Sequence, residues 1–306
     1  MLPWNQPILD SLRRRMDRMP HALLLHGPPG VGKLELAEGI AQLVLCESPD
    51  AARRPCGACD ACRWFLAGNH PDFRRLEPEA LMKEPPESEG KPSIVIKIDQ
   101  VRELADFVNL RSHRGGLRVA LAHPAEDMNP NAANALLKSL EEPPAGAIFL
   151  LVAHRPASLP PTIRSRCVAL PVPLPPREAA LAWLAGQGVK DGERWLAYAG
   201  GAPRRAMGYA AEGQALEQIL RSPAPVDDRQ QLERLAEALH KLALDRALSA
   251  FGLPPKYRAD PSPAQAGTAR AWLAFARQMG EDRRLVRHPL DPRLFSAAML
   301  IAMPKS

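Results

Sequence analysis

The sequence predicts an α/β domain built on a parallel sheet, followed by two helical domains. Three observations support this fold class. An apolar run over 22–26 leads into a glycine-rich turn and then into a helical pattern. Two further apolar runs, over 119–122 and 147–153, are separated by a helical pattern that ends at a proline pair, as is typical of buried parallel strands joined by helices. From about residue 211 onward, apolar residues recur at helical spacing.

The composition is that of an ordinary soluble globular protein. The 306 residues are 46% hydrophobic and 24% charged, and their apolar runs are much shorter than a membrane span. The N-terminus has no cationic stretch followed by an apolar one, so we expect no secretion signal, no membrane association and a cytoplasmic location. The net charge of +6 comes without a dense Lys/Arg block, so the composition does not indicate a strong DNA-binding surface in the lone chain.

The turn after the first predicted strand has the spacing of a phosphate-binding loop. Gly27, Gly32 and Lys33 match G-x-x-x-x-G-K, and Gly30 lies between them. The backbone N–H groups of such a loop, its lysine and the following helix N-terminus surround phosphate oxygens. Leu34 stands where Ser or Thr usually supplies the hydroxyl that holds Mg²⁺. The sequence therefore predicts a loop that can bind ATP or ADP but is poorly suited to hydrolysis.

A cysteine cluster follows the helix of this loop. Cys46, Cys56, Cys59 and Cys62 are spaced C-x9-C-x2-C-x2-C, and in a reducing compartment such a cluster favours metal binding over disulfides. Four thiolates complete a closed tetrahedral site, so we predict a structural Zn²⁺ module over 46–62. His70 is a rival ligand, but its Gly-Asn-His-Pro-Asp context favours a loop residue.

The strand predicted over 119–122 does not end in acidic residues. In a phosphate-loop nucleotidase this strand end supplies carboxylates that hold Mg²⁺ and position the attacking water, whereas here it ends in His123-Pro124. Glu126 and Asp127 follow at a predicted helix start, where acidic residues are favourable for electrostatic reasons alone. We therefore expect these two carboxylates to have a structural role.

The combination of motifs resembles the clamp-loader branch of the AAA+ family. The resemblance covers at least residues 1–210 and rests on the phosphate loop, the cysteine module, the segment 134–144 and Ser165-Arg166-Cys167, which is the S-R-C motif of that branch. It implies a P-loop AAA+ domain over 1–172, a small helical lid over 173–210 and a helical collar over 211–306. In the family the S-R-C arginine reaches into a neighbouring subunit's ATP site, which implies a trans-acting catalytic role for Arg166. The lid's second sensor arginine, which contacts nucleotide, corresponds best to Arg204.

The resemblance also implies partners and a function. They are delta-type and gamma/tau-type clamp-loader subunits in a hetero-oligomeric ring that places a sliding clamp on primed DNA, within a replicative DNA-directed DNA polymerase (nucleotidyltransferase) holoenzyme. Leu34, His123-Pro124 and Val152-Ala153-His154 all depart from the motor subunits of the family. These departures indicate a subunit that does not hydrolyse ATP itself. Two alternatives stay open: an ATP-hydrolysing motor subunit, and a zinc-dependent nucleic-acid-binding protein.

Overall fold

The computed structural model describes residues 1–82, 85, 92–110, 116–259, 268–286, 288 and 290–304. The chain divides into two compact units, Met1–Leu174 and Pro175–Ser306, which we describe separately. Within the described residues, no helix is both long enough and apolar enough to span a membrane.

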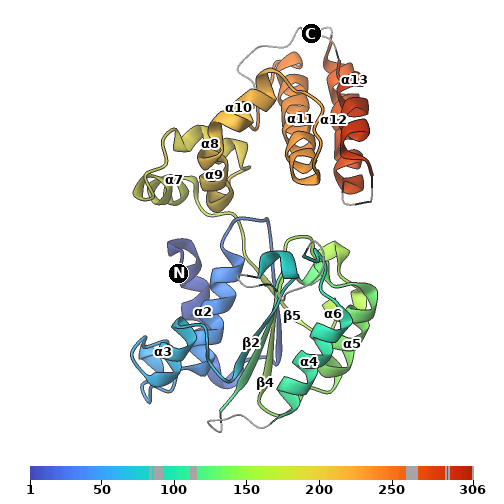
Figure 1. Cartoon of the computed structure of the whole chain (residues 1–306). Coiled ribbons are helices and arrows are strands. Elements are labelled where there is room, and N and C mark those ends of the chain that lie inside the picture. The colour runs from blue at the N-terminus through green and yellow to red at the C-terminus, as the bar shows by residue number, and fades with distance from the viewer. Residues whose placement is uncertain are drawn as a thin grey trace. The chain divides into compact units, whose positions relative to one another are not determined.

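The first unit is an α/β domain around a five-stranded parallel sheet in the order β2-β3-β4-β1-β5 (Figure 1). The apolar runs of the sequence form its middle: β3 and β4 are buried along their whole length, and β1 is buried up to its last residue. This confirms the predicted parallel α/β fold. The strands are β1 (Ala22–His26), β2 (Phe73–Leu76), β3 (Arg118–Ala122), β4 (Ala147–Ala153) and β5 (Val168–Pro171).

Helices cover both faces of this sheet. Helix α2 packs on β3 and β4 from one side, while α4 and α5 lie together on the other (Figure 1). Alternation along the strands makes this possible, because Leu24 and Leu151 point into the cluster that holds Leu104 of α4 and Leu136 of α5. The helices of this unit are α1 (Gln6–Arg13), α2 (Lys33–Leu45), α3 (Asp60–Leu66), α4 (Ile98–Asn109), α5 (Pro130–Glu141) and α6 (Pro161–Arg164).

Short 3-10 helices connect several of these elements. They are η1 (Pro3–Asn5), η2 (Met16–Arg18), η3 (Ala51–Arg53), η4 (Glu79–Leu81), η5 (Ala125–Asp127) and η6 (Pro156–Ser158). Because the carboxyl ends of β1, β3 and β4 meet at one edge of the sheet, the phosphate loop, the residues after β3 and those after β4 are brought together there.

The described residues of the second unit form helices and no strand. These helices are α7 (Arg177–Gly186), α8 (Gly192–Tyr198), α9 (Pro203–Ala211), α10 (Gly213–Arg221), α11 (Arg229–Ala250), α12 (Ala269–Leu285) and α13 (Pro292–Ile301). One core cluster lies among α7 to α10 and includes Ala238 and Leu242 of α11; a second joins α11, α12 and α13. The long helix α11 thus contributes to both cores. The division of this region into a lid and a collar stays a prediction.

Candidate nucleotide site, metal centre and trans-acting arginine

The glycines of the phosphate loop are required by close packing around them. Gly27 has φ +151°, and a Cβ there would lie 2.1 Å from the carbonyl oxygen of Val172. Gly32 has φ +87°, and a Cβ would lie 2.1 Å from the Leu2 side chain. Gly30 also has a positive φ, +81°. Side chains at these positions would force the backbone out of the loop geometry.

The N-terminal segment holds the second half of the loop. The Trp4 indole donates a hydrogen bond to the Val31 carbonyl at 2.9 Å. Buried Asn5 donates from Nδ2 to the carbonyls of Val31 and Gly32, at 3.2 and 2.9 Å. Sequence reasoning missed these two residues, because an ordinary Trp and Asn separated from their partners by 26 or more residues carry no local signal.

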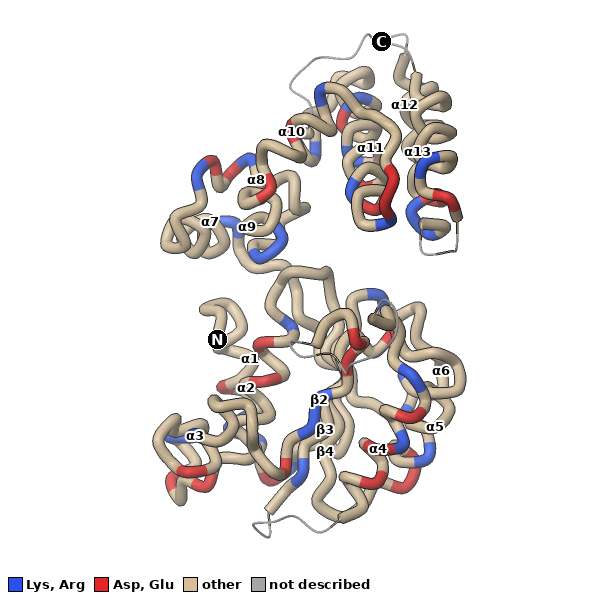
Figure 2. The backbone as a smooth tube through the Cα atoms, in the orientation of Figure 1, with Lys and Arg blue, Asp and Glu red and all other residues tan. Residues whose placement is uncertain are grey.

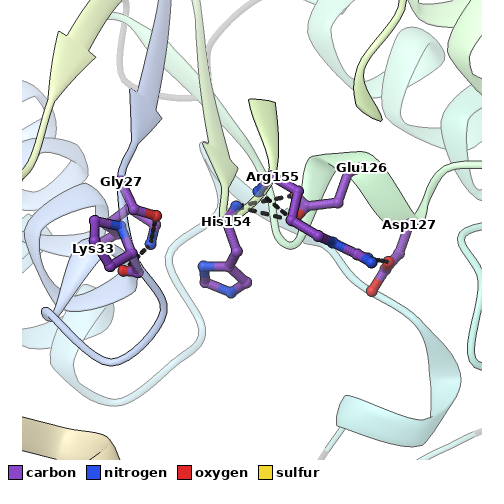
Figure 3. Close-up of polar contacts among 7 residues, drawn as sticks. Gly27, Lys33, Glu126, Asp127, His154 and Arg155 are labelled. Atoms are coloured by element: carbon purple, nitrogen blue, oxygen red, sulfur yellow. Dashed lines mark hydrogen bonds and ion pairs between the residues drawn. The ribbon is translucent and has the colours of Figure 1, made fainter. Parts of the chain in front are cut away.

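Lys33 is folded back onto the loop rather than pointing into solvent. Its Nζ donates to the carbonyls of Gly27 and Pro28, at 2.7 and 2.6 Å (Figure 3). Burial lowers the pKa of the Lys33 ammonium to about 8, although the negative charge of Glu126 opposes this shift. These two contacts use two of the three N–H donors of the ammonium.

The carboxylate of Glu126 is used by the backbone at the end of β4. Its oxygens accept hydrogen bonds from the N–H groups of His154, at 2.9 and 3.2 Å, and of Arg155, at 2.9 Å (Figure 3). The side chain is 1% exposed and also pairs with the Arg155 guanidinium at 3.7 Å. Asp127 pairs with the same guanidinium at 3.5 Å. Both acids therefore join η5 to the segment after β4.

Two histidines lie at the strand ends beside Lys33. The rings of His123 and His154 make an edge contact with centroids 5.3 Å apart. Burial lowers the pKa of His123 to about 4, with further contributions from His154, Arg75 and Lys33. At neutral pH His123 is therefore an uncharged imidazole. Such a group is a poor ligand for Mg²⁺, which prefers oxygen.

The four predicted cysteines converge in space. The Sγ atoms of Cys46, Cys56, Cys59 and Cys62 all lie within 4.8 Å of one another, and those of Cys46 and Cys59 are 3.9 Å apart. Tetrahedral Zn–S bonds of 2.3 Å place sulfurs about 3.8 Å apart, so the geometry fits a Zn²⁺ ion. His70 is not part of this group; its Nδ1 accepts a hydrogen bond from the Asp72 N–H at 3.0 Å.

Backbone donors surround the sulfurs of this cluster. The N–H groups of Ala58 and Cys59 point at the Cys56 sulfur, at 3.5 and 3.3 Å, and they lower the pKa of Cys56 to about 6. Burial instead raises the pKa of Cys46, and it raises that of Cys62 to about 12. A cation among the four sulfurs would favour their thiolate forms. The cluster therefore fits a metal centre better than a set of free thiols.

Arg166 lies between the short helix α6 and β5. Its guanidinium donates from Nη1 to the Thr162 carbonyl at 2.9 Å and to the Ser165 hydroxyl at 3.3 Å, and Nη2 pairs with Glu141 at 2.5 Å. The side chain is 34% exposed. Arg166 is thus at the surface of the α/β unit, held by contacts within its own chain.

Arg204 belongs to the other unit, in the first turn of α9, and is exposed. Its neighbour Arg205 is instead drawn into a largely buried group, where it contacts Tyr209 and Glu237. Lys241, which is 4% exposed, lies against the rings of Tyr198 and Tyr209 in the same group. Of the two arginines, Arg204 is the one directed to the surface. Charges of both signs are interspersed along both units (Figure 2).

Comparison with known proteins decides the family. A family model described as "DNA polymerase III, delta subunit" matches residues 6–175. The DNA polymerase III subunit delta' of Pseudomonas aeruginosa is 41% identical over 265 residues, which are 85% of this chain and 72% of that protein. The chain belongs to the DNA polymerase III delta' family.

A second delta' relative agrees with this assignment, and a solved structure agrees with the fold. The Escherichia coli delta' subunit is 36% identical over 60% of this chain and 52% of its own length, so the alignment spans about half of that relative. A DNA polymerase III gamma subunit-related protein from Thermotoga maritima superposes with a TM-score of 0.54 at 18% identity, covering 96% of this chain and 97% of that one. This likeness supports the AAA+ type of fold.

Proposed function

We propose that this chain is a clamp-loader subunit that does not hydrolyse ATP and that supplies Arg166 to the ATP site of a neighbouring subunit. It would act in a ring with delta-type and gamma/tau-type subunits, which opens a sliding clamp and places it on primed DNA. The membership of the delta' family supports this role, and the geometry of the phosphate loop and strand ends supports the division of labour.

The observation that carries the proposal is the engagement of Glu126. A hydrolytic site needs a carboxylate free to hold Mg²⁺ through water and to orient the attacking water. Glu126 is a carboxylate and lies near Lys33, but its oxygens accept hydrogen bonds from the His154 and Arg155 backbone N–H groups. Its side chain is 1% exposed. Withdrawing it would leave two backbone donors without their acceptor.

Two further positions also argue against ATP hydrolysis at this loop. Leu34, in the first turn of α2, offers no hydroxyl to Mg²⁺, and the end of β3 offers His123 in place of an acid. A Mg²⁺–ATP complex would therefore lack its usual protein ligands here. The intact glycines and Lys33 still form a phosphate cradle, so we propose that any ATP or ADP bound by this loop binds weakly and is not turned over.

Arg166 has the chemistry that a trans-acting residue needs. A guanidinium stays charged at any cellular pH and can hydrogen-bond two phosphate oxygens at once. Delivered from outside, such an arginine stabilises the charge of the γ-phosphoryl transition state and accelerates hydrolysis by several orders of magnitude elsewhere. Its position at the surface, ahead of β5, leaves the side chain accessible to another subunit.

The test is a reconstituted clamp-loader complex that contains Arg166→Ala. We expect normal assembly and a reduced DNA-stimulated ATPase. Arg164→Ala is the matched control, because Arg164 is an exposed arginine two residues earlier in α6. Unchanged ATPase in the Arg166 variant would remove Arg166 from this role. Robust Mg²⁺-dependent turnover by the isolated chain would identify a motor subunit instead.

A further inference from the structure

We propose that Glu141 is the positioning residue for Arg166: it holds the guanidinium against its own chain until a neighbour's phosphate replaces the carboxylate. The inference rests on the proposed trans-acting role of Arg166. It adds a second residue to that site and predicts that the arginine is restrained in the free subunit.

The contacts of the guanidinium support a restrained state. Nη1 donates to the carbonyl of Thr162 and to the hydroxyl of Ser165, both within one turn of chain, at 2.9 and 3.3 Å. Nη2 pairs with the Glu141 carboxylate at 2.5 Å. These three acceptors lie on α5, α6 and the residue that follows α6. A phosphate of another subunit that draws the guanidinium away from these acceptors must therefore replace the Glu141 carboxylate.

The position of Glu141 in its helix gives an independent argument. Glu141 is the last residue of α5, and the helix ends there ahead of Pro143-Pro144. Carboxylates are disfavoured at a helix C-terminus, where the backbone carbonyls already carry partial negative charge. The arginine offsets this local repulsion when it is bound. Its departure therefore leaves an unfavourable charge, which adds to the force that returns the guanidinium to Glu141.

The ion pair between Arg166 and Glu141 restrains the arginine side chain but is weak enough for a phosphate to replace it. The side chains of Arg166 and Glu141 are 34% and 48% exposed, and exposed ion pairs are weak and screened by salt. The phosphate groups of ATP carry more negative charge than one carboxylate and accept two guanidinium N–H groups. We therefore infer that docking of a nucleotide-loaded neighbour reverses the balance, whereas a neighbour without nucleotide leaves Arg166 on Glu141.

The first test uses the isolated full-length chain. Modification of arginines by phenylglyoxal, mapped by mass spectrometry, reports how free the Arg166 guanidinium is. We expect Glu141→Gln to raise the Arg166 modification rate about 1.5- to 5-fold, the range for losing an exposed ion pair. The difference from wild type should shrink as salt rises. Glu142→Gln is the matched control, because Glu142 is the exposed next residue and makes no ion pair with the residues that the structure describes.

The second test uses the reconstituted complex. Glu141→Gln should raise the DNA-stimulated ATPase by a similar factor at subsaturating ATP, and it should have no effect when Arg166 is already Ala. Equal modification rates in wild type and Glu141→Gln, or a lower ATPase in Glu141→Gln, would overturn the role of Glu141. If Arg166→Ala leaves the ATPase unchanged, the proposed function fails instead, whatever the modification rates show.

Discussion

Replacing Glu126 tests whether its carboxylate has a structural or a catalytic role. Glu126→Ala removes the acceptor of the His154 and Arg155 N–H groups, both now bonded at 2.9 Å. Each backbone donor left without an acceptor costs about 1–3 kcal/mol when it is buried. Because Arg155 is at an exposed position where water can replace the lost acceptor, we expect the free energy of unfolding of the α/β unit to fall by about 2–4 kcal/mol in total.

Urea denaturation of the full chain measures this loss, and hydrogen exchange assigns it to the right unit. Peptides from β4 and the segment after it should lose protection, while peptides from α11 and α12 should exchange as in wild type. Glu126→Gln keeps an acceptor oxygen without the charge, so we expect it to cost about half as much. Asp127→Asn is the matched control, because Asp127 is the neighbouring acid of η5 and pairs with the exposed Arg155 side chain at 3.5 Å.

The reasoning fails if Glu126→Ala folds with wild-type stability and abolishes ATP hydrolysis by the complex. That result would show that the carboxylate is free to serve Mg²⁺ or water. The opposite pattern, a destabilised subunit whose assembled complex keeps its ATPase, is the one that we predict.

Three further predictions concern the metal centre, the loop and the strand ends. The purified chain should contain about one Zn²⁺, and either removal of the ion by a chelator or Cys56→Ser should lower the melting temperature. If these changes abolish salt-sensitive DNA binding and leave the melting temperature unchanged, a nucleic-acid-binding role is favoured instead. Gly27→Ala places a Cβ 2.1 Å from the Val172 oxygen and should cost about 3 kcal/mol or more in urea denaturation, whereas Gly68→Ala, at φ +79° with no atom within 4 Å of its Cβ, should cost only about 1–2 kcal/mol. The pKa of His123 is lowered from 6.5 to about 4, so between these pH values the unfolded chain binds a proton that the folded chain does not. The free energy of unfolding therefore falls as the pH falls from 6.5 to 4. His123→Asn should reduce that fall by at most about 3 kcal/mol, and an unchanged dependence of the free energy of unfolding on pH would contradict the shift.

The sequence predicts the centre of the α/β unit well and its margins poorly. Strands β1, β3 and β4 contain the continuous apolar runs 22–25, 119–122 and 147–153, as expected of strands that are buried on both faces. Strand β2 reads Phe-Arg-Arg-Leu, which has no strand pattern, because it is an edge strand with two exposed positions. There the Arg74 guanidinium lies over the Phe107 ring and Arg75 pairs with Glu38. Because long polar side chains cover apolar neighbours in this way, an edge strand lacks the apolar pattern from which a strand is predicted.

Some parts of the candidate sites are likewise predicted from the sequence and others are not. Cysteine spacing predicts the metal cluster because its members are close in sequence and two C-x-x-C units overlap. The partners of Glu126 lie 28 and 29 residues away, and those of Trp4 and Asn5 lie 26 or 27 away. The Glu126 pairs are created by the sheet order, which places β4 beside β3, and the Trp4 and Asn5 pairs by the packing of the N-terminal segment on the phosphate loop. A sequence pattern indicates which residue types are present at a strand end, but the strand order decides which of them become partners.

The phosphate loop shows why a binding motif does not by itself establish nucleotide binding. Each element of G-x-x-x-x-G-K has a partner within this chain: Gly27 lies against the Val172 carbonyl, Gly32 against Leu2 and Asn5, and Lys33 donates to the Gly27 and Pro28 carbonyls. Packing alone therefore requires both glycines, and two of the three donors of the lysine ammonium are satisfied without phosphate. Nucleotide binding that moves Lys33 away from these carbonyls must supply the free energy to break both contacts, in a site whose burial already disfavours the charge of the ammonium. A loop of this kind is therefore required by the fold whether or not it binds nucleotide.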